Sequence, residues 1–595
     1  MNGSDPVLRS RLLTLLLVLA VLLSGGVALP LTGASPAKLF DAEGLKNAGD
    51  ILSGLARPDF SAEFLARVLE LSLESLLIGV LGTVMATVLG TLLALAAIRV
   101  PDLDDPPQRL PAWWRGLGAL MRQLARLLLN FFRSVPEIVW AYLFVQLLGL
   151  GPGAAVLAIM LTVGGNIGKL YAELAEALEP AAIRALRATG ASRGAVLLHA
   201  VLPQVRRAWT GYALFCLECN IRIGSILGVV GAGGLGSEIA LSLRYFQYDK
   251  LATTLLAVLV FVVALEALGA RLRRWPLQRT LALAGLGTAA ALWRLEIAWA
   301  DLWSGSSVAL LSFEHLAPDA VFMRTVALQT GETVLMAWAA TLASALGAAV
   351  LAPLAAAHLS TGSFLPDPPR PAWPRRLALW AGRQSARAVL QLTRVMPELT
   401  LALVFVVWVG GGPLAGILAI AVHNLGVMGR LFADVLDEAE PGPPAVLQAQ
   451  GAGRLAVFVA GVWPQVRARL AAFALYRFEV NVRATTMVGF VGAGGIGDAL
   501  HTAISLFHVR DLTLLLIVLQ VSLLGGRIFR LRGNLRQRSA ELAVALTRIS
   551  EMAHRDELTQ LPNRRALVQA LETHLTQGAA ARPMSVCLLD VDHFK

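Results

Sequence analysis

Cysteine is scarce in this chain, with only three among 595 residues. So few thiols cannot build a disulfide framework, which excludes a small disulfide-rich scaffold. Cys216 and Cys219 have the spacing of a redox pair, but they lie in an apolar run without ligand partners. We therefore interpret them as two small buried side chains.

Charged residues are also few. They make up 15% of the chain, whereas 56% of the residues are hydrophobic and the mean hydropathy is +0.65. A water-soluble protein of this length could not hide so much apolar surface, so we expect a lipid environment. The net charge of +11 could suggest a nucleic-acid partner. The Arg residues lie in short loops between apolar runs rather than on one face, which argues against nucleic acid.

Long apolar runs divide the chain into two sets. They begin near residues 12, 67, 127, 154, 208 and 249, and again near 281, 326, 388, 413, 468 and 510. Each covers about 20 residues or more, enough to cross a hydrocarbon core of about 30 Å. The first run resembles a secretory signal, but a matching run opens the second set, so we expect a retained helix. The predicted fold class is an all-α integral membrane protein with twelve crossings.

Loop Arg and Lys residues predict the orientation of these helices. With the N-terminus in the cytoplasm, the inner loops carry far more of them than the outer loops. Cytoplasmic loops of membrane proteins show this excess. An even number of crossings then places both termini in the cytoplasm.

The same motifs occur twice at a constant offset of 261 residues. Segment 133–137 returns at 394–398, 218–222 returns at 479–483, and 230–236 returns at 491–497. A period this long indicates two homologous membrane halves of about six helices each, which we expect to face each other across a pseudo-two-fold axis. We assign residues 1–275 to the first unit and 276–528 to the second.

A long loop between the fourth and fifth predicted helices of each half combines Ala, Gly, Arg and Pro. Small Ala residues let a helix approach a partner closely, Gly permits a bend, and Pro is expected to end the second helix. The pattern resembles the EAA coupling loop of bacterial ATP-binding-cassette importers, which sits in a groove of a separate ATPase subunit. The leading Glu of that pattern is replaced by Arg184 and Ala445. The residues assigned to coupling are Ala185, Gly190, Arg193 and Pro203 in the first half and Gly451, Arg454 and Pro464 in the second.

Three further motifs narrow the resemblance. Arg-x-x-Pro-Glu, Glu-x-Asn-x-Arg and a Val-Gly-Ala-Gly-Gly cluster occur in both halves and resemble phosphonate-type permeases. Members of that group import phosphonates, and relatives handle phosphite or phosphate. The usual member has one such unit and dimerises, whereas this chain resembles two fused units. The resemblance implies a bacterial inner-membrane location, separate ATPase subunits that bind ATP and Mg, a periplasmic substrate-binding protein, and no cofactor on this chain.

Eight charged residues interrupt the apolar runs in pairs four residues apart. They are Arg133 with Glu137, Glu218 with Arg222, Arg394 with Glu398, and Glu479 with Arg483. A charge at the middle of a membrane helix costs about 2.5–3.5 kcal/mol, so these side chains should face the bundle interior, each pair on one helix face. The Arg residues either line a path that attracts an anionic substrate, or each pair is a neutralised clamp between the halves or near the headgroups. Pro136 and Pro397 should kink their helices beside the pairs.

The Gly clusters at 231–236 and 492–497 are not followed by Lys-Ser or Lys-Thr, as a phosphate-binding loop would be. We interpret them as tight re-entrant turns or close helix contacts. The chain is therefore expected to carry no ATPase of its own and not to be an enzyme.

The composition changes near the C-terminus. Leu535, Leu542 and Ile549 recur every seven residues, which predicts a helix over 529–555 that either self-associates or is a solvated linker. Residues 556–595 resemble the opening of a GGDEF diguanylate cyclase domain, the start of an α/β fold. In that family the residue matching Asp590 helps to bind a divalent metal. The GGDEF signature does not occur before Lys595, so we expect an incomplete cyclase site in a fragment or a truncated gene.

Three functions remain open at this point. The chain is a permease of an ATP-driven importer, a permease-derived sensor that regulates a C-terminal cyclase, or an ion-coupled secondary transporter. The third would not need two cytoplasmic coupling loops. Neighbouring genes for an ATPase and a binding protein would favour the first over the second.

Overall fold

The computed structural model describes residues 20, 23–98, 112–272, 274–297, 299, 320–357, 372–506, 511, 514, 515, 517 and 518. All elements within these ranges are helices, in agreement with the predicted all-α class. The chain divides into two units, Met1–Leu523 and Leu524–Lys595. The predicted heptad helix and the cyclase-like segment belong to the second unit and lie outside the described residues.

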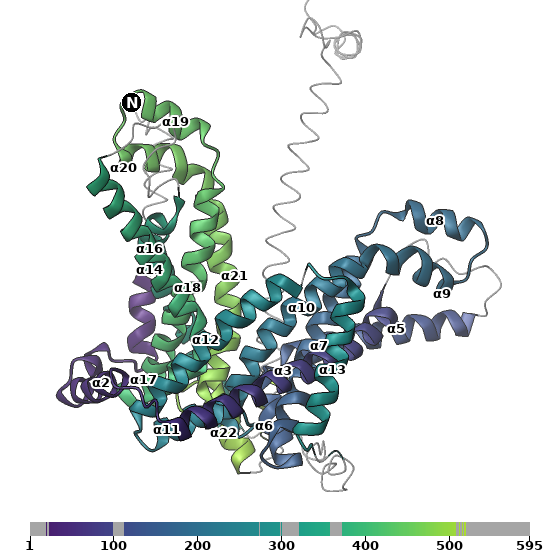
Figure 1. Cartoon of the computed structure of the whole chain (residues 1–595), viewed down its shortest axis with the longest axis horizontal. Helices are drawn as coiled ribbons and strands as arrows, with labels where there is room; N and C mark the ends of the chain where they lie inside the picture. Colours follow the sequence, from purple (N-terminus) through teal and green to yellow (C-terminus); the bar gives the residue numbers. More distant parts are fainter. Residues whose placement is uncertain are drawn as a thin grey trace, which may run out of the picture. The chain divides into compact units, whose positions relative to one another are not determined.

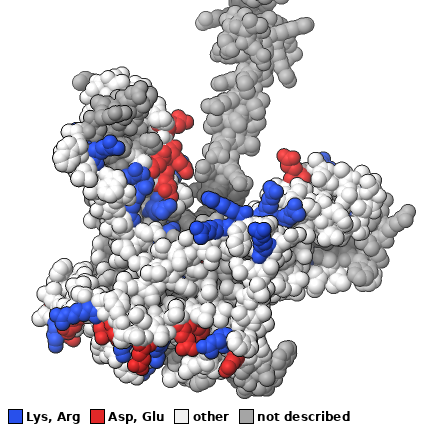
Figure 2. All heavy atoms as spheres, in the orientation of Figure 1, with Lys and Arg blue, Asp and Glu red and all other residues white. Residues whose placement is uncertain are grey.

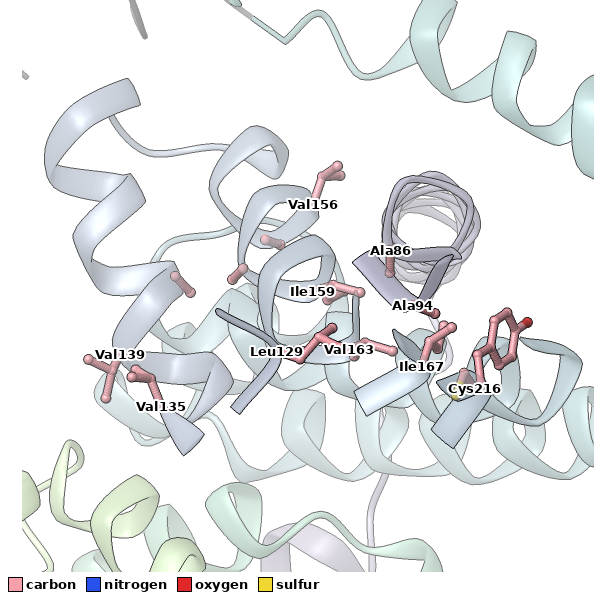
Figure 3. Close-up of a cluster of buried hydrophobic side chains, with 14 of the residues drawn as sticks. Ala86, Ala94, Leu129, Val135, Val139, Val156, Ile159, Val163, Ile167 and Cys216 are labelled. Atoms are coloured by element: carbon pink, nitrogen blue, oxygen red, sulfur yellow. The ribbon is translucent and has the colours of Figure 1, made fainter. Parts of the chain in front are cut away.

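Two long helices form the centre of the first half (Figure 1). α3 (Ala62–Ala97) packs along α7 (Pro152–Glu176), which α5 (Ala112–Ser134), α6 (Glu137–Leu148) and α10 (Leu202–Leu227) also contact. Small and β-branched side chains such as Ala86, Ile159 and Val163 fill the space between these helices (Figure 3). A Gly-rich turn then leads into α11 (Leu235–Arg244) and α12 (Tyr248–Leu272).

The second half repeats this arrangement. α14 (Ala320–Ala355) packs along α18 (Pro413–Asp437), with α16 (Trp373–Val395), α17 (Glu398–Val409), α21 (Trp463–Gly489) and α22 (Ile496–Ser505) in the corresponding places. Individual bonds repeat as well. The Nε atoms of Arg126 and Arg387 each donate to a carbonyl oxygen at 3.0 Å, that of Ala97 and that of Ala355 respectively. The duplication read from the motifs is therefore present in three dimensions.

The opening helix of each half packs against the other half. In the helical stretch over 23–31, the Oγ of Ser24 accepts a hydrogen bond of 2.9 Å from Trp338 Nε1 of α14. α13 (Leu277–Arg294), which opens the second half, packs on α3 of the first, and Arg294 Nη2 lies 2.6 Å from Glu70 Oε1. These contacts between each opening helix and the other half hold the two halves together.

The surface of the first unit suits a bilayer. Leu69 of α3 and Val350 of α14 are 72% and 68% exposed, which is unfavourable in water but not against lipid. Figure 2 shows a wide band of uncharged surface, with charged residues of both signs above and below it. By length and composition, six helices in the described ranges can span a membrane, or up to eight if each bent pair counts as one span. The described residues thus do not reproduce all twelve predicted crossings, and the runs near 12 and 510 fall largely outside them.

Candidate functional site

The third predicted helix of each half is two helices, not one kinked helix. α5 ends at Ser134 and α6 begins at Glu137, with a bend of 91° between them, and α16 and α17 make the same 91° bend. Pro136 and Pro397 occupy the cap positions with extended backbone, because proline cannot donate the helical hydrogen bond and disfavours a helical residue before it. Arg133 and Glu137 thus belong to different helices. The expectation that four-residue spacing places them on one helix face is wrong, as it is for Arg394 and Glu398.

Close packing against the central helix of each half supports these breaks. A Cβ atom on Gly165 of α7 would lie 2.7 Å from the backbone nitrogen of Arg133, and one on Gly426 of α18 would lie even closer to that of Arg394. Only glycine allows so close an approach. This close approach of the helices fixes the position from which each Arg side chain extends.

The intramembrane charges of the two halves interact with one another. Arg133 is close enough to Arg483 and Glu479 of the other half to act on them electrostatically. Glu137 is likewise close enough to Arg483 and to Glu398 to interact with them electrostatically. All eight predicted residues are half-buried rather than exposed, and Glu218 packs against Gly269 of α12. The arrangement across the halves fits both a substrate path and a clamp between the halves.

The second half contains polar residues that the motif analysis did not single out. His423 and Asn424 on α18 and Arg477 on α21 lie among the predicted charges. The Nε2 atom of His423 is 3.5 Å from Glu398 Oε1, and Arg222 of the first half lies close enough to His423 to act on it electrostatically. Arg477 is a further charge in an apolar run, and that signal could have been read from the sequence.

The proposed coupling segments have the same structure in both halves. α8 (Pro180–Ala188) is followed by Gly190 with φ of +81°, and α19 (Gly442–Ala449) by Gly451 with φ of +84°. Such left-handed backbone is easy only for glycine. α9 (Arg193–Val196) and α20 (Arg454–Ala456) then continue through a π-helical turn into α10 and α21.

The role predicted for the two prolines needs correction. Pro203 and Pro464 do not end the second short helix but lie in the first turn of α10 and α21. Each proline closely follows the π-helical turn, where its missing N–H interrupts the regular hydrogen bonding of the continuous helix.

The coupling segments present apolar side chains to the surroundings. Leu198 is 58% exposed, and Leu455 and Val459 are also exposed. Ala185, Gly190, Pro203, Gly451, Arg454 and Pro464 are all exposed as well. In each half α10 or α21 separates this segment from the Gly-rich turn, since the two lie at opposite ends of the helix.

The Gly clusters form tight turns attached to the long helices. Gly231, Gly233 and Gly234 have positive φ, as do the corresponding three residues of the second half. The N–H of Gly151 donates to the carbonyl oxygen of Gly231 at 3.0 Å, and that of Gly412 to Gly492 at 2.8 Å. These turns are thus held by the backbone itself.

In the described part of the chain, Cys216 and Cys219 form no disulfide, and no metal site is found. Cys216 is buried among apolar side chains and Cys219 is half-buried, both as free thiols. No group of His, Cys, Asp and Glu within the described ranges could hold a metal ion. Asp590, the predicted metal ligand, lies outside those ranges.

Comparison with known proteins identifies both parts of the chain. Residues 110–280 and 376–538 match the family described as "Binding-protein-dependent transport system inner membrane component". Residues 553–595 match the diguanylate cyclase GGDEF domain family.

Named relatives are similar over the membrane part. The chain is 32% identical over 442 residues to a phosphate-import permease protein of Mycolicibacterium smegmatis, an alignment covering 70% of this chain and 78% of that protein. It is 43% identical over 151 residues to a phosphite transport system permease protein of Stutzerimonas stutzeri, covering 25% and 55%. A putative cryptic phosphonate transport system permease protein of Escherichia coli is 44% identical over 117 residues, covering 19% of this chain and 96% of that protein.

The duplicated helical halves, each with a Gly-centred loop segment and a broken third helix, coincide with the two family matches. The chain is a multi-pass inner-membrane protein that belongs to the family of inner-membrane components of binding-protein-dependent transport systems.

Proposed function

We propose that this chain is the transmembrane permease of an ATP-driven importer for a phosphorus oxyanion such as phosphonate, phosphite or phosphate. Residues 1–275 and 276–528 act as its two permease units, with both termini in the cytoplasm. Separate ATPase subunits bind ATP and Mg, and a periplasmic protein delivers the substrate. The names of the relatives support this substrate class.

The observation that carries the proposal is the pair of exposed coupling segments. Each projects a short helix, a left-handed glycine and exposed apolar side chains beyond the end of a membrane helix. Exposed apolar patches outside a membrane commonly mark sites of protein association. Two such segments at equivalent places suit two copies of an ATPase subunit.

Aspartate substitutions on both segments test the coupling. Gly190→Asp together with Gly451→Asp places a charge in each proposed contact, and neither site has an atom within 4 Å of a new Cβ. We expect loss of copurification with the ATPase while membrane insertion is retained. The matched control is Gly33→Asp, since Gly33 also has positive φ and open space around it. Copurification that survives the double substitution would remove the coupling role.

A sensor is the second candidate, and the match to a GGDEF domain at 553–595 favours it. In this case the helix over 529–555 would pass a change in the membrane domain to the cyclase. Adding oxyanion to cells that carry the full chain separates the two functions. Uptake without a change in cyclic dinucleotide identifies a permease, whereas a change in cyclic dinucleotide without uptake identifies a sensor.

A further inference from the structure

The two halves differ at three positions beside otherwise duplicated site residues. His423, Asn424 and Arg477 of the second half correspond to Thr162, Val163 and Cys216 of the first half. In the first half, Val163 and Cys216 belong to an apolar cluster (Figure 3). The eight intramembrane charges occur in both halves, whereas at these positions only the second half has a cation and an amide, so it contains a polar site that the first half lacks.

Arg477 is held in place by a chain of hydrogen bonds. Its Nε donates to Asn424 Oδ1 at 2.7 Å, and its Nη2 donates to the same oxygen. The Nδ2 of Asn424 in turn donates to Asn481 Oδ1 at 2.7 Å, and Asn481 Nδ2 donates to Thr341 Oγ1 at 2.8 Å. Arginine can only donate, so this sequence of bonds orients both amides. The guanidinium group has five N–H groups, more than these two bonds use.

His423 adds a group that can carry a proton. Its Nδ1 is 2.8 Å from the carbonyl oxygen of Met396, which can only accept, so the hydrogen lies on Nδ1. In a neutral ring Nε2 is then an acceptor, and it faces the Glu398 carboxyl group at 3.5 Å. His423 therefore presents its second ring nitrogen to the carboxyl group of Glu398.

The first half has the same backbone contact without this capability. The hydroxyl of Thr162 donates to the carbonyl oxygen of Val135 at 3.4 Å, at the position where His423 contacts Met396. Threonine offers no second nitrogen to the carboxyl group of Glu137. The pairing of a histidine ring with this carboxyl group is specific to the second half.

We propose that Glu398, His423 and Arg477 form a single oxyanion site in the second half, which holds a phosphorus oxyanion that still carries a hydroxyl group. Arg477 binds the charged oxygens, and Glu398 accepts the hydrogen bond from the P–OH group. Sulfate has no hydroxyl to donate and leaves the carboxylate facing a charged oxygen, so the site rejects it. This inference rests on the proposed function and adds to it that one half carries the recognition.

Substitutions by the residues of the first half test the site. Arg477→Cys and His423→Thr are made in the full chain, with Cys216→Ala as the matched control. Binding of radiolabelled inorganic phosphate to the purified permease is measured with and without excess sulfate, together with membrane abundance and the KM for phosphate uptake. We expect Arg477→Cys to weaken binding and raise KM about tenfold at unchanged abundance, because one charge-assisted hydrogen bond to the oxyanion is lost. His423→Thr should weaken binding in the same direction, because the ring that contacts Glu398 and holds it in position is removed. The control should stay within about twofold.

Glu398→Gln tests recognition separately from stability, because a purely structural role of Glu398 would not change the competition between sulfate and phosphate. Glutamine can donate as well as accept, so sulfate should now compete with phosphate. Should Arg477→Cys have low abundance, His423→Thr decides the question, since threonine occupies the equivalent place in the first half. Wild-type phosphate uptake with unchanged KM and unchanged sulfate exclusion in the variants would overturn this inference alone. An absence of any phosphorus oxyanion uptake in the wild type, with the ATPase present, would overturn the proposed function as well.

Discussion

The backbone N–H of Leu235 donates a hydrogen bond of 3.0 Å to the Oγ of Ser75. The second half repeats this relationship, because the N–H of Ile496 donates to Thr333 Oγ1 at 2.9 Å. A hydroxyl on each long helix thus receives the first N–H after the Gly-rich turn. Both bonds are buried, so the turn depends on them.

Removing one of these hydroxyls should destabilise the half that contains it. Thr333→Val keeps the shape of the side chain but leaves the Ile496 N–H buried without its acceptor, at a cost of about 1–3 kcal/mol. Thr333→Ser retains the hydroxyl and should lose much less. Thermal unfolding of the purified protein in detergent measures the difference. Equal midpoints for the Val and Ser variants would show that the bond contributes little.

The glycines that pack against the broken helices should not tolerate a larger side chain. Gly165→Ala places a methyl group against the Arg133 backbone and should cost about 1–3 kcal/mol through overpacking. Gly382→Ala in α16 meets nothing within 4 Å and should be neutral or stabilising by up to about 1 kcal/mol, as alanine is the better helix former. Unfolding midpoints of the two variants provide the comparison. A stable Gly165→Ala protein would contradict the close packing.

Alanine substitution separates the two interpretations of the intramembrane Arg residues. If Arg133 and Arg394 attract the substrate, Arg133→Ala and Arg394→Ala should lower anion uptake more than they lower protein abundance. The reason is that a substrate path needs positive charge, whereas assembly does not. Uptake per molecule in membrane vesicles is the measurement. Losses of uptake and abundance in equal proportion would favour a structural clamp between the halves.

Equivalent asparagines should contribute unequally to stability. Asn481 connects Asn424 with Thr341, whereas Asn220 contacts Thr83 at 2.8 Å. Asn481→Leu removes two buried side-chain hydrogen bonds where Asn220→Leu removes one, and it should cost more by about 0.5–1.5 kcal/mol. Denaturation of the two variants in the same detergent checks the order. A reversed order would argue that the network around Arg477 is not intact.

Several features of the fold could be predicted from the sequence. The long apolar runs beginning near 67 and 326 became α3 and α14, because burial in lipid depends on the composition of each run. The Gly clusters became tight turns, since consecutive glycines permit left-handed backbone. The twelve predicted crossings are not all reproduced in the described residues. α21 carries Arg477, Glu479 and Arg483 in its middle and is not among the helices apolar enough to span by composition.

The membrane environment, the duplication and the transport family could all be predicted without coordinates, because composition and repeated motifs are local properties of the chain. Three relationships became visible only in the folded chain: the bend of 91° at Pro136, the electrostatic interaction of Arg133 with Arg483 of the other half, and the hydrogen bond that Arg477 donates to Asn424. These contacts join positions far apart in the chain. A comparison of the repeats also emphasises what they share, and the residues that distinguish the halves are those that do not repeat.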